Sequence, residues 1–274
     1  MKRKRNILFY TRKKGLDSKK QNKVREILAD AARRCQIDIY EYPEIPENID
    51  LVIAAGGDGT FLDASHIAVK YDVPVAGLNI GQLGFLAEIN MDEWHIIDSI
   101  FHGKYKLTER MMIDIKASRG ENLIFNEKVL NEVVVHRTLD APMLLLSLKY
   151  GDEELPEYKA DGVIVATPTG STAYNLSFSG PIIYPTEESF VINAMAPHAL
   201  THRPIVLPSN KELVITIKDC KKSILNCDGR HIANIKKDDV ITIKMSDKKL
   251  KYIANPERTF FSILSEKLHL GKRM

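Results

Sequence analysis

The stretch LVIAAGGDGT, residues 51–60, decides the fold class of this 274-residue chain. Its first five residues, Leu51–Ala55, form a continuous apolar run, which is typical of a strand buried on both faces of a parallel sheet. The run ends in a glycine-rich turn, Gly56–Thr60, and Thr60–Tyr71 has the pattern of a helix. Ligands bind open α/β sheets at the carboxyl ends of the strands, so a functional site is expected at this turn.

The turn has the properties of a phosphate-binding loop that carries one reactive group. Glycines let backbone N–H groups approach phosphate oxygens without an intervening Cβ, and a helix N-terminus favours anions. Asp58 is the residue of the turn with acid–base chemistry, because a positioned carboxylate takes the proton of a hydroxyl that attacks phosphorus. The alternative is a tight turn in which Asp58 caps the helix. No Gly-Lys-Ser/Thr of a Walker loop follows, and kinases resembling phosphofructokinases and diacylglycerol kinases share the pattern, so the turn indicates phosphoryl transfer without naming the substrate.

The periodicity of the sequence predicts two domains. Residues 1–103 alternate between strand and helix patterns, which predicts a Rossmann-like α/β domain with a parallel sheet. Residues 104–274 contain short strand-like runs divided by turn signals, which predicts an all-β, sandwich-like domain. The last stretch, Phe260–Lys267, is predicted to be a helix that packs back on the first domain. The strands expected in the second domain are residues 111–117, 130–136, 143–150, 163–166, 213–217, 224–227, 240–245 and 250–253.

The composition favours a globular protein over a membrane-spanning or nucleic-acid-binding one. A hydrophobic fraction of 44% supports a proper core, and the absence of a run of about 18 apolar residues predicts that nothing spans a membrane. A net charge of +3, with basic residues spread along the chain, does not call for a nucleic-acid partner. The cysteines, Cys35, Cys220 and Cys227, are odd in number and lack CxxC spacing. We therefore expect a cytoplasmic protein in a reducing compartment.

Two polar segments in the second half are candidate binding motifs. Asn131-Glu132 offers amide and carboxylate groups to base and ribose edges, although ordinary strand-edge polarity is the alternative. In Asp161–Pro181 an apolar strand runs into a turn dense in Gly, Pro, Ser and Thr, followed by a predicted helix. The hydroxyl and N–H groups at that helix start suit a nucleotide, and Tyr174 is placed to stack on an adenine face. A long polar loop with a capped helix is the alternative.

Taken in this order and spacing, Gly56–Thr60, Asn131-Glu132 and Asp161–Pro181 resemble the NAD kinase family of bacterial type. The segment Pro197–Val206 also resembles bacterial members, and the similarity spans roughly residues 50–265. Asp161–Pro181 is specific to this family, whereas the glycine turn is shared more widely.

The resemblance implies transfer of the terminal phosphate of ATP, or of polyphosphate, to the 2′-hydroxyl of the adenosine ribose of NAD, which gives NADP. It implies Asp58 as general base, a divalent metal such as Mg²⁺ for which the sequence assigns no ligands, and a homodimer or homotetramer. The residues that it places at the NAD site are Asp58, Gly59, Asn131, Glu132, Lys159, Asp161, Thr172, Ala173, Tyr174, Asn175, Leu176, Ser177 and Ala196.

Two positions depart from the family pattern, and two other functions remain as alternatives. Asp63 stands where the family often has Arg or Lys, and a carboxylate there does not help to hold phosphate. Arg230 replaces a glutamine in the turn Asp228-Gly229-Arg230, for which a hairpin is the simple interpretation. The alternatives are a non-catalytic NAD(P)-binding sensor and a lipid or sphingoid kinase that shares the glycine turn. Asp58 argues against the first, and Asp161–Pro181 argues against the second.

Overall fold

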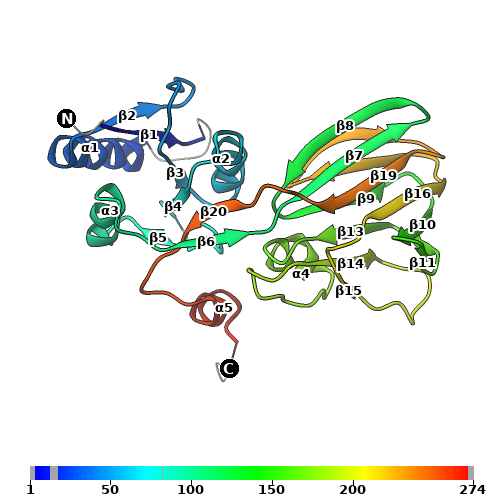
Figure 1. Ribbon diagram of the computed structural model, residues 1–274. Coiled ribbons are helices and arrows are strands. Elements are labelled where there is room, and N and C mark those ends of the chain that lie inside the picture. Colours follow the sequence, from blue (N-terminus) through cyan, green and yellow to red (C-terminus); the bar gives the residue numbers. More distant parts are fainter. Residues whose placement is uncertain (1–3, 13–17, 82, 271–274) are drawn as a thin grey trace. The chain divides into compact units, whose positions relative to one another are not determined.

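The structure, a computed structural model, describes residues 4–12, 18–81 and 83–270. The chain divides into two compact units, which we describe separately (Figure 1). Unit 1 comprises residues 1–109 and 250–274, and unit 2 comprises residues 110–249. The first crossing between them lies close to the expected boundary at residue 103. The segment from Leu250 onward, however, belongs to unit 1 together with its terminal helix.

Unit 1 is an α/β unit around a seven-stranded sheet of order β2-β1-β3-β4-β20-β6, with β5 also paired to β4. The pairs β1–β2, β1–β3, β3–β4, β4–β5 and β4–β20 are all parallel, which confirms the predicted α/β class. Every residue of β3 is buried, as its continuous apolar run predicts. The elements are β1 (Arg5–Tyr10), α1 (Ser18–Cys35), β2 (Ile37–Glu41), β3 (Leu51–Gly56), α2 (Asp58–Tyr71), β4 (Val75–Asn79), β5 (Ile89–Asn90), α3 (Trp94–Phe101), β6 (Leu107–Arg110), β20 (Leu250–Ile253) and α5 (Phe260–Leu268).

Strand β20 corrects the expected assignment of residues 250–253 to the β-rich domain. Tyr252 and Ile253 pair in parallel with Val75 and Ala76 of β4. The buried Tyr252 hydroxyl also donates to the backbone oxygen of Leu86 at 3.0 Å. A short apolar run looks the same in a parallel and in an antiparallel sheet, so its local pattern does not specify its partner.

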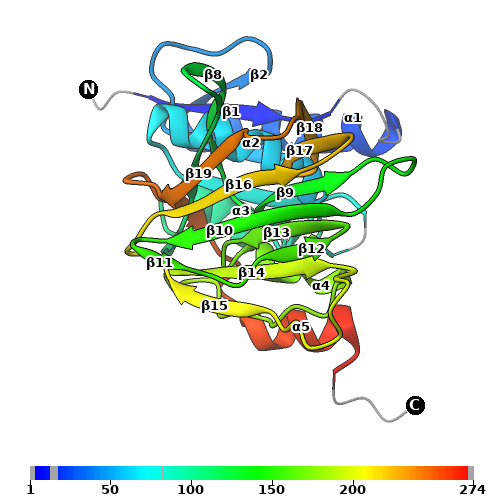
Figure 2. The ribbon, with the colours of Figure 1, turned by 90° about the vertical axis from the view of Figure 1, so that its right-hand side faces the viewer.

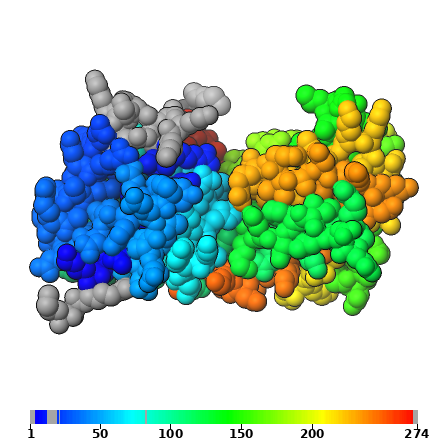
Figure 3. Space-filling view, turned by 90° about the horizontal axis from the view of Figure 1, so that it is seen from above, coloured from blue at the N-terminus to red at the C-terminus, as the bar shows by residue number. Residues whose placement is uncertain are grey.

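Unit 2 is a sandwich of two antiparallel sheets, as predicted (Figure 2). The first has the order β11-β10-β16-β19-β7-β8, with β12 also paired to β10, and the second has the order β15-β14-β13-β9-β17-β18. Side chains from both sheets form one apolar core. The green β7–β8 hairpin lies beside the orange strand β19 within this unit (Figure 3). The elements are β7 (Ile113–Arg119), β8 (Asn122–Val129), β9 (Glu132–Arg137), β10 (Leu144–Tyr150), β11 (Glu153–Glu154), β12 (Tyr158–Ala160), β13 (Gly162–Ala166), η1 (Gly170–Thr172), α4 (Tyr174–Ser177), β14 (Ser189–Met195), β15 (Ile205–Pro208), β16 (Leu213–Asp219), β17 (Ser223–Cys227), β18 (Arg230–Ile235) and β19 (Val240–Met245).

The second sheet of the sandwich is buried on both faces. Val133 and Val165 face the sandwich core, whereas Val134 and Ile164 belong to a second apolar cluster on the opposite face. Phe178 packs against that cluster, so the segment after β13 covers the outer face of the sheet. This double burial explains the uninterrupted apolar runs of β9 and β13.

The helices differ from expectation in one place. The helix expected in Asp161–Pro181 is reduced to a turn of 3₁₀ helix, Gly170–Thr172, and one turn of α-helix, Tyr174–Ser177. Among the helices of the described residues, none has both the length and the apolar composition needed to cross a membrane.

Candidate active site

The glycine turn occupies the carboxyl end of β3, as predicted. Gly57 is the N-cap of α2, and Asp58 is the first residue of that helix. The backbone N–H of Thr60 donates to the oxygen of Gly57 at 2.9 Å, which closes the first turn. The side chain of Asp58 makes no capping bond to α2 at the N-cap, so the interpretation of Asp58 as a helix cap finds no support.

The carboxylate of Asp58 is held by a second loop of unit 1. Phe85 N donates to Oδ2 at 3.0 Å, and the backbone N–H groups of Leu86 and Ala87 donate to Oδ1 at 3.0 and 3.1 Å. A carboxylate oxygen accepts about two hydrogen bonds, so Oδ1 is saturated while Oδ2 keeps one acceptor site. The half-buried carboxylate is therefore fixed in orientation and has one oxygen available for a hydroxyl proton.

Asp63, the departure from the family pattern, is neutralised by Arg12, which follows the end of β1. Arg12 Nε donates to Asp63 Oδ2 at 2.6 Å, and the Tyr10 hydroxyl donates to the same oxygen at 3.2 Å. The position of a Cβ at Gly59 would lie 2.9 Å from Arg12 Nη1. A guanidinium group thus lies against the glycine turn, and the sequence reasoning did not select it.

In unit 2 the structure brings the second and third motifs together. Thr167 follows β13, and its backbone N–H donates to the oxygen of Asn131 at 2.8 Å. Its hydroxyl donates to the oxygen of Leu130 at 2.6 Å. In the sheet, Ala166 of β13 is paired with Glu132 of β9. The Asn-Glu pair and the Thr-rich turn therefore form one local structure.

Asp228 fixes the Asn-Glu pair from the other side. Asp228 and Gly229 have φ of 48° and 71° and connect β17 to β18, which agrees with the expected hairpin turn. The buried carboxylate also accepts from the backbone N–H groups of Leu130 at 3.0 Å and Asn131 at 2.7 Å. Sequence reasoning treated Asp228 as an ordinary turn residue, and Asp-Gly is the expected signal for a turn alone. Arg230 donates to Glu127 at 3.4 Å.

Glu132 and Asn131 carry two polar atoms that their surroundings leave unsatisfied. Both side chains are buried, and Asn131 Oδ1 and Glu132 Oε2 have no hydrogen-bond partner among the described residues. Burial raises the pKa of Glu132 to about 8, the charge of Asp228 adds to the rise, and the backbone N–H of Tyr174 opposes it. Buried polar atoms are normally hydrogen-bonded, so these two unpaired atoms on consecutive residues are candidates for contact with a ligand.

The segment Thr172–Ser177 divides into exposed and buried residues. Tyr174 is 44% exposed and meets Phe178 edge-on, with ring centroids 5.2 Å apart. Ser177 is exposed, whereas Thr172, Ala173 and Leu176 are half-buried.

Asn175 differs from the other residues of this segment because its side chain is fully buried and fully bonded. Its Nδ2 donates to the oxygens of Ser171 at 3.2 Å and Pro181 at 3.3 Å, and its Oδ1 accepts from Asn193 Nδ2 at 3.1 Å. The amide therefore holds the segment in shape and has no side-chain group left for a ligand.

Asp161 is also engaged within the protein. Arg137 Nε donates to Asp161 Oδ1 at 2.6 Å and Arg137 Nη2 donates to Oδ2 at 3.1 Å, a bidentate pair. The backbone N–H of Asp161 donates to Met195, next to Ala196, which is exposed and has a φ of 43°. Lys159 is exposed two residues before Asp161. The sequence did not indicate Arg137, since its only signal is its place at the end of a strand paired with β13.

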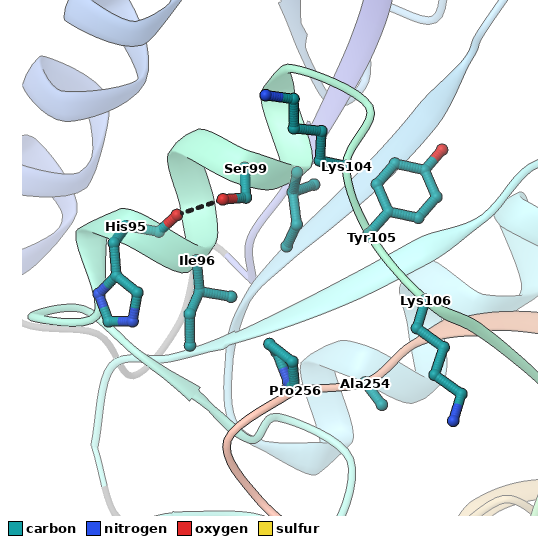
Figure 4. Close-up of a pocket in the computed structure, with 9 residues that line it drawn as sticks. His95, Ile96, Ser99, Lys104, Tyr105, Lys106, Ala254 and Pro256 are labelled. Carbon is teal, nitrogen blue, oxygen red and sulfur yellow. Dashed lines mark hydrogen bonds between the residues drawn. The ribbon is translucent and has the colours of Figure 1, made fainter.

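The predicted residues thus occupy both units, with Asp58 and Gly59 in unit 1 and the other predicted residues in unit 2. Among the described residues, one group of three side chains has the spacing of a metal site: Cys35 at the end of α1, Asp98 on α3 and His102 directly after α3. It includes none of the predicted site residues. A cavity of about 390 Å³ in unit 1, lined by α3 and by residues near Tyr105 and Pro256, contains none of them either (Figure 4).

Comparison with known proteins identifies the family. The description "ATP-NAD kinase N-terminal domain" matches residues 6–105, and "ATP-NAD kinase C-terminal domain" matches residues 130–255. A protein of Magnetococcus marinus named NAD kinase is 37% identical over 257 residues, which cover 91% of this chain and 85% of the relative. One of Aquifex aeolicus with the same name is 37% identical over 228 residues, which cover 82% and 83% of the two chains.

Solved structures share the fold. A yeast NADH kinase complexed with NADH has a TM-score of 0.89 at 21% identity and covers 100% of this chain and 89% of its own. An Archaeoglobus fulgidus NAD kinase in complex with ATP has a TM-score of 0.74 at 24% identity and covers 97% and 98% of the two chains. The two matched domains and the extent of identity to named relatives lead to one conclusion: this chain belongs to the NAD kinase family.

Proposed function

We propose that this enzyme transfers the terminal phosphate of ATP to the 2′-hydroxyl of the adenosine ribose of NAD and so makes NADP. The observation that carries the proposal is the Asp58 carboxylate, fixed by three backbone N–H groups beside a glycine turn and left with one open acceptor site on Oδ2. A ribose hydroxyl is a poor nucleophile, and a positioned carboxylate that takes its proton lowers the barrier.

The chemical step follows from this geometry. Asp58 Oδ2 accepts the proton of the 2′-hydroxyl as its oxygen forms a bond to the terminal phosphorus of ATP. The bond between that phosphorus and the bridging oxygen breaks, and ADP leaves with the electron pair. No covalent enzyme intermediate is needed, because direct transfer depends on positioning and on charge stabilisation.

The acceptor is proposed to be NAD because unit 2 offers groups suited to a dinucleotide. Asn131 and Glu132 present two buried polar atoms that lack partners among the described residues. Tyr174 presents an exposed ring of the kind that stacks on a base. Lys159, Asp161 and Ala196, with Thr172, Ala173, Leu176 and Ser177, are proposed to line the same binding surface, and Asn175 to maintain its shape.

A divalent metal such as Mg²⁺ forms part of the proposal. Kinases hold Mg²⁺ with one or two carboxylates together with substrate phosphates, where it neutralises developing charge. The one open acceptor site of Asp58 Oδ2 is needed for the hydroxyl proton, so the metal would be held chiefly by the ATP phosphates with which it arrives. A cytoplasmic location and a homodimer or homotetramer are proposed on the family membership and, for the location, on the free cysteines.

A coupled assay tests the function. Purified protein is incubated with NAD, ATP and Mg²⁺, and NADP is measured with an NADP-specific dehydrogenase. We expect NADP to form with ATP, and parallel reactions with NADH and with polyphosphate define the range of acceptor and donor. Dinucleotide binding without turnover would instead identify a sensor, and phosphorylation of a sphingoid base in place of NAD would identify a lipid kinase.

A further inference from the structure

The strongest unassigned feature is the group formed by Tyr10, Arg12 and Asp63 beside the glycine turn. Tyr10 is the last residue of β1, Arg12 follows it, and Asp63 lies on α2. Asp63 Oδ2 accepts from Arg12 Nε at 2.6 Å and from the Tyr10 hydroxyl at 3.2 Å. Burial, reinforced by the charge of Asp63, raises the pKa of Tyr10 to about 12, so the phenol keeps its proton and donates. The carboxylate is thereby fixed and in turn fixes the guanidinium.

The bond through Nε leaves the other end of the guanidinium directed at the turn. A Cβ built at Gly59 would lie 2.9 Å from Arg12 Nη1 and 3.5 Å from Nη2. Any side chain at position 59 would therefore displace the guanidinium from the residue next to Asp58. Arg12 is about half exposed, with 49% of its side chain accessible, so its terminal nitrogens are within reach of a ligand.

The chemistry of the exposed end suits phosphate. Among the described residues, neither Nη1 nor Nη2 has a hydrogen-bond partner, and a planar guanidinium presents such donors in a fork that matches phosphate oxygens. Asp63 alone would place negative charge on α2 about one and a half turns after the proposed catalytic carboxylate. When it is paired with Arg12, the Asp63 carboxylate is neutralised, and it holds the Arg12 guanidinium in a fixed orientation.

We infer that Arg12 binds a phosphate group of the donor nucleotide and that Asp63 is the positioning residue that holds it there. The inference rests on the proposed function, in which the glycine turn receives ATP. The cation that would bind phosphate is thus on Arg12, after β1, and not at position 63 of α2.

A second arginine of unit 1 shows what an ordinary surface pair looks like. Arg25 on α1 donates from Nε to Glu41 Oε1 and Oε2, each at 3.2 Å, and from Nη2 to Glu41 as well. Glu41 accepts hydrogen bonds from both Nε and Nη2 of Arg25, whereas Asp63 accepts only from Nε of Arg12. Arg25→Ala is therefore a matched control for the loss of an exposed ion pair without loss of a phosphate donor.

The test compares donor and acceptor constants in Arg12→Ala, Arg12→Lys and Arg25→Ala. Removing a charged hydrogen-bond donor to phosphate should raise the KM for ATP by about tenfold or more, with the KM for NAD within about twofold of wild type. Arg12→Lys should recover part of the loss, because it restores charge without the fork. Arg25→Ala should leave both constants at the wild-type values.

The role of Asp63 is tested by moving the guanidinium group from position 12 to position 63. The double variant Arg12→Ala with Asp63→Arg places a guanidinium on α2 and should recover ATP affinity relative to Arg12→Ala. Direct titration of each protein with Mg-ATP, without NAD, gives the same comparison without turnover. The inference is overturned if folded Arg12→Ala binds ATP as tightly as wild type. If the wild-type protein makes no NADP, the proposed function fails, and the ATP titrations still decide the role of Arg12.

Discussion

Gly84 and Asp58 approach so closely that a Cβ at residue 84 would lie 2.0 Å from the carboxylate Oδ1 and 2.7 Å from its Cγ. The approach lets the backbone that follows residue 84 donate three hydrogen bonds to Asp58. The orientation of the proposed base thus depends on a residue of another loop, about 26 positions further along the chain.

Gly84→Ala should damage both stability and turnover. The added methyl group must displace the carboxylate or the loop, and such overpacking costs about 1–3 kcal/mol of unfolding free energy. Urea denaturation and the NADP assay measure the two effects. Gly81→Ala is the control, because nothing lies within 4 Å of a Cβ at that position. Equal behaviour of the two variants would refute the proposed packing.

Asp58→Asn should abolish most turnover and leave NAD binding close to wild type. The amide keeps the shape of the side chain but cannot take a proton from the ribose hydroxyl, and loss of a general base lowers kcat about 10²- to 10⁴-fold. Rapid-quench kinetics and NAD titration separate the two quantities. Asp72→Asn, at the other end of α2, controls for removal of one negative charge. A variant that turns over at the wild-type rate would remove Asp58 from its role.

Glu132→Gln should flatten the pH dependence of stability. The folded-state pKa of Glu132 is about 8, above its ordinary value of 4.5, so the folded protein binds more protons than the unfolded chain between these values. Stability therefore falls as pH rises from about 4.5 to about 8, and the Gln variant lacks this loss. Denaturation midpoints at pH 5 and pH 8 measure it, with Glu127→Gln, at an exposed position of β8, as control. Parallel pH profiles in Glu132→Gln and wild type would contradict the assignment.

Asn175→Ala should destabilise unit 2 and weaken NAD binding together. Removing the amide leaves the backbone oxygens of Ser171, which is buried, and Pro181 without this donor, at a cost of about 1–3 kcal/mol. Ser177→Ala, in the same turn but exposed, is the control for stability. The denaturation midpoint of Asn175→Ala should fall well below that of Ser177→Ala, and equal midpoints would show that the amide network is dispensable.

Tyr174→Ala should raise the KM for NAD, whereas Tyr174→Phe should not. Stacking of a base on an aromatic ring contributes about 1–3 kcal/mol, which corresponds to roughly 5- to 150-fold in affinity. Steady-state kinetics at saturating ATP measure the change. An unchanged KM in the Ala variant would mean that the exposed ring of Tyr174 does not contact the dinucleotide.

The α/β class, the sandwich and the glycine turn were predictable because their signals are local. Continuous apolar runs mark strands such as β3, and glycines between a strand and a helix mark the turn. The sheet to which β20 belongs was not predictable, because its pairing with β4 joins residues that are far apart in sequence. The strand pattern of residues 250–253 is compatible with either sheet.

The hydrogen-bond partners of the proposed site residues could not be predicted from the sequence. Asp58 was identified from its motif, but nothing in the sequence links it to Leu86 or Ala87. Likewise, Asp228 carried only a turn signal, and Arg12 only a surface charge. Each acquires its role through a hydrogen bond that the fold creates, and motif spacing does not encode such bonds.

The pairing of β20 with the first sheet affects how the protein folds during its synthesis on the ribosome. Residues 110–249 are translated between β6 and β20, so the nascent N-terminal part lacks one of its strands for on the order of ten seconds at typical elongation rates. During that interval, the part of the edge of β4 that β20 later covers has no partner strand. Chaperone capture of stalled chains should therefore be strongest before residue 250 emerges and should decline once the C-terminal segment is released.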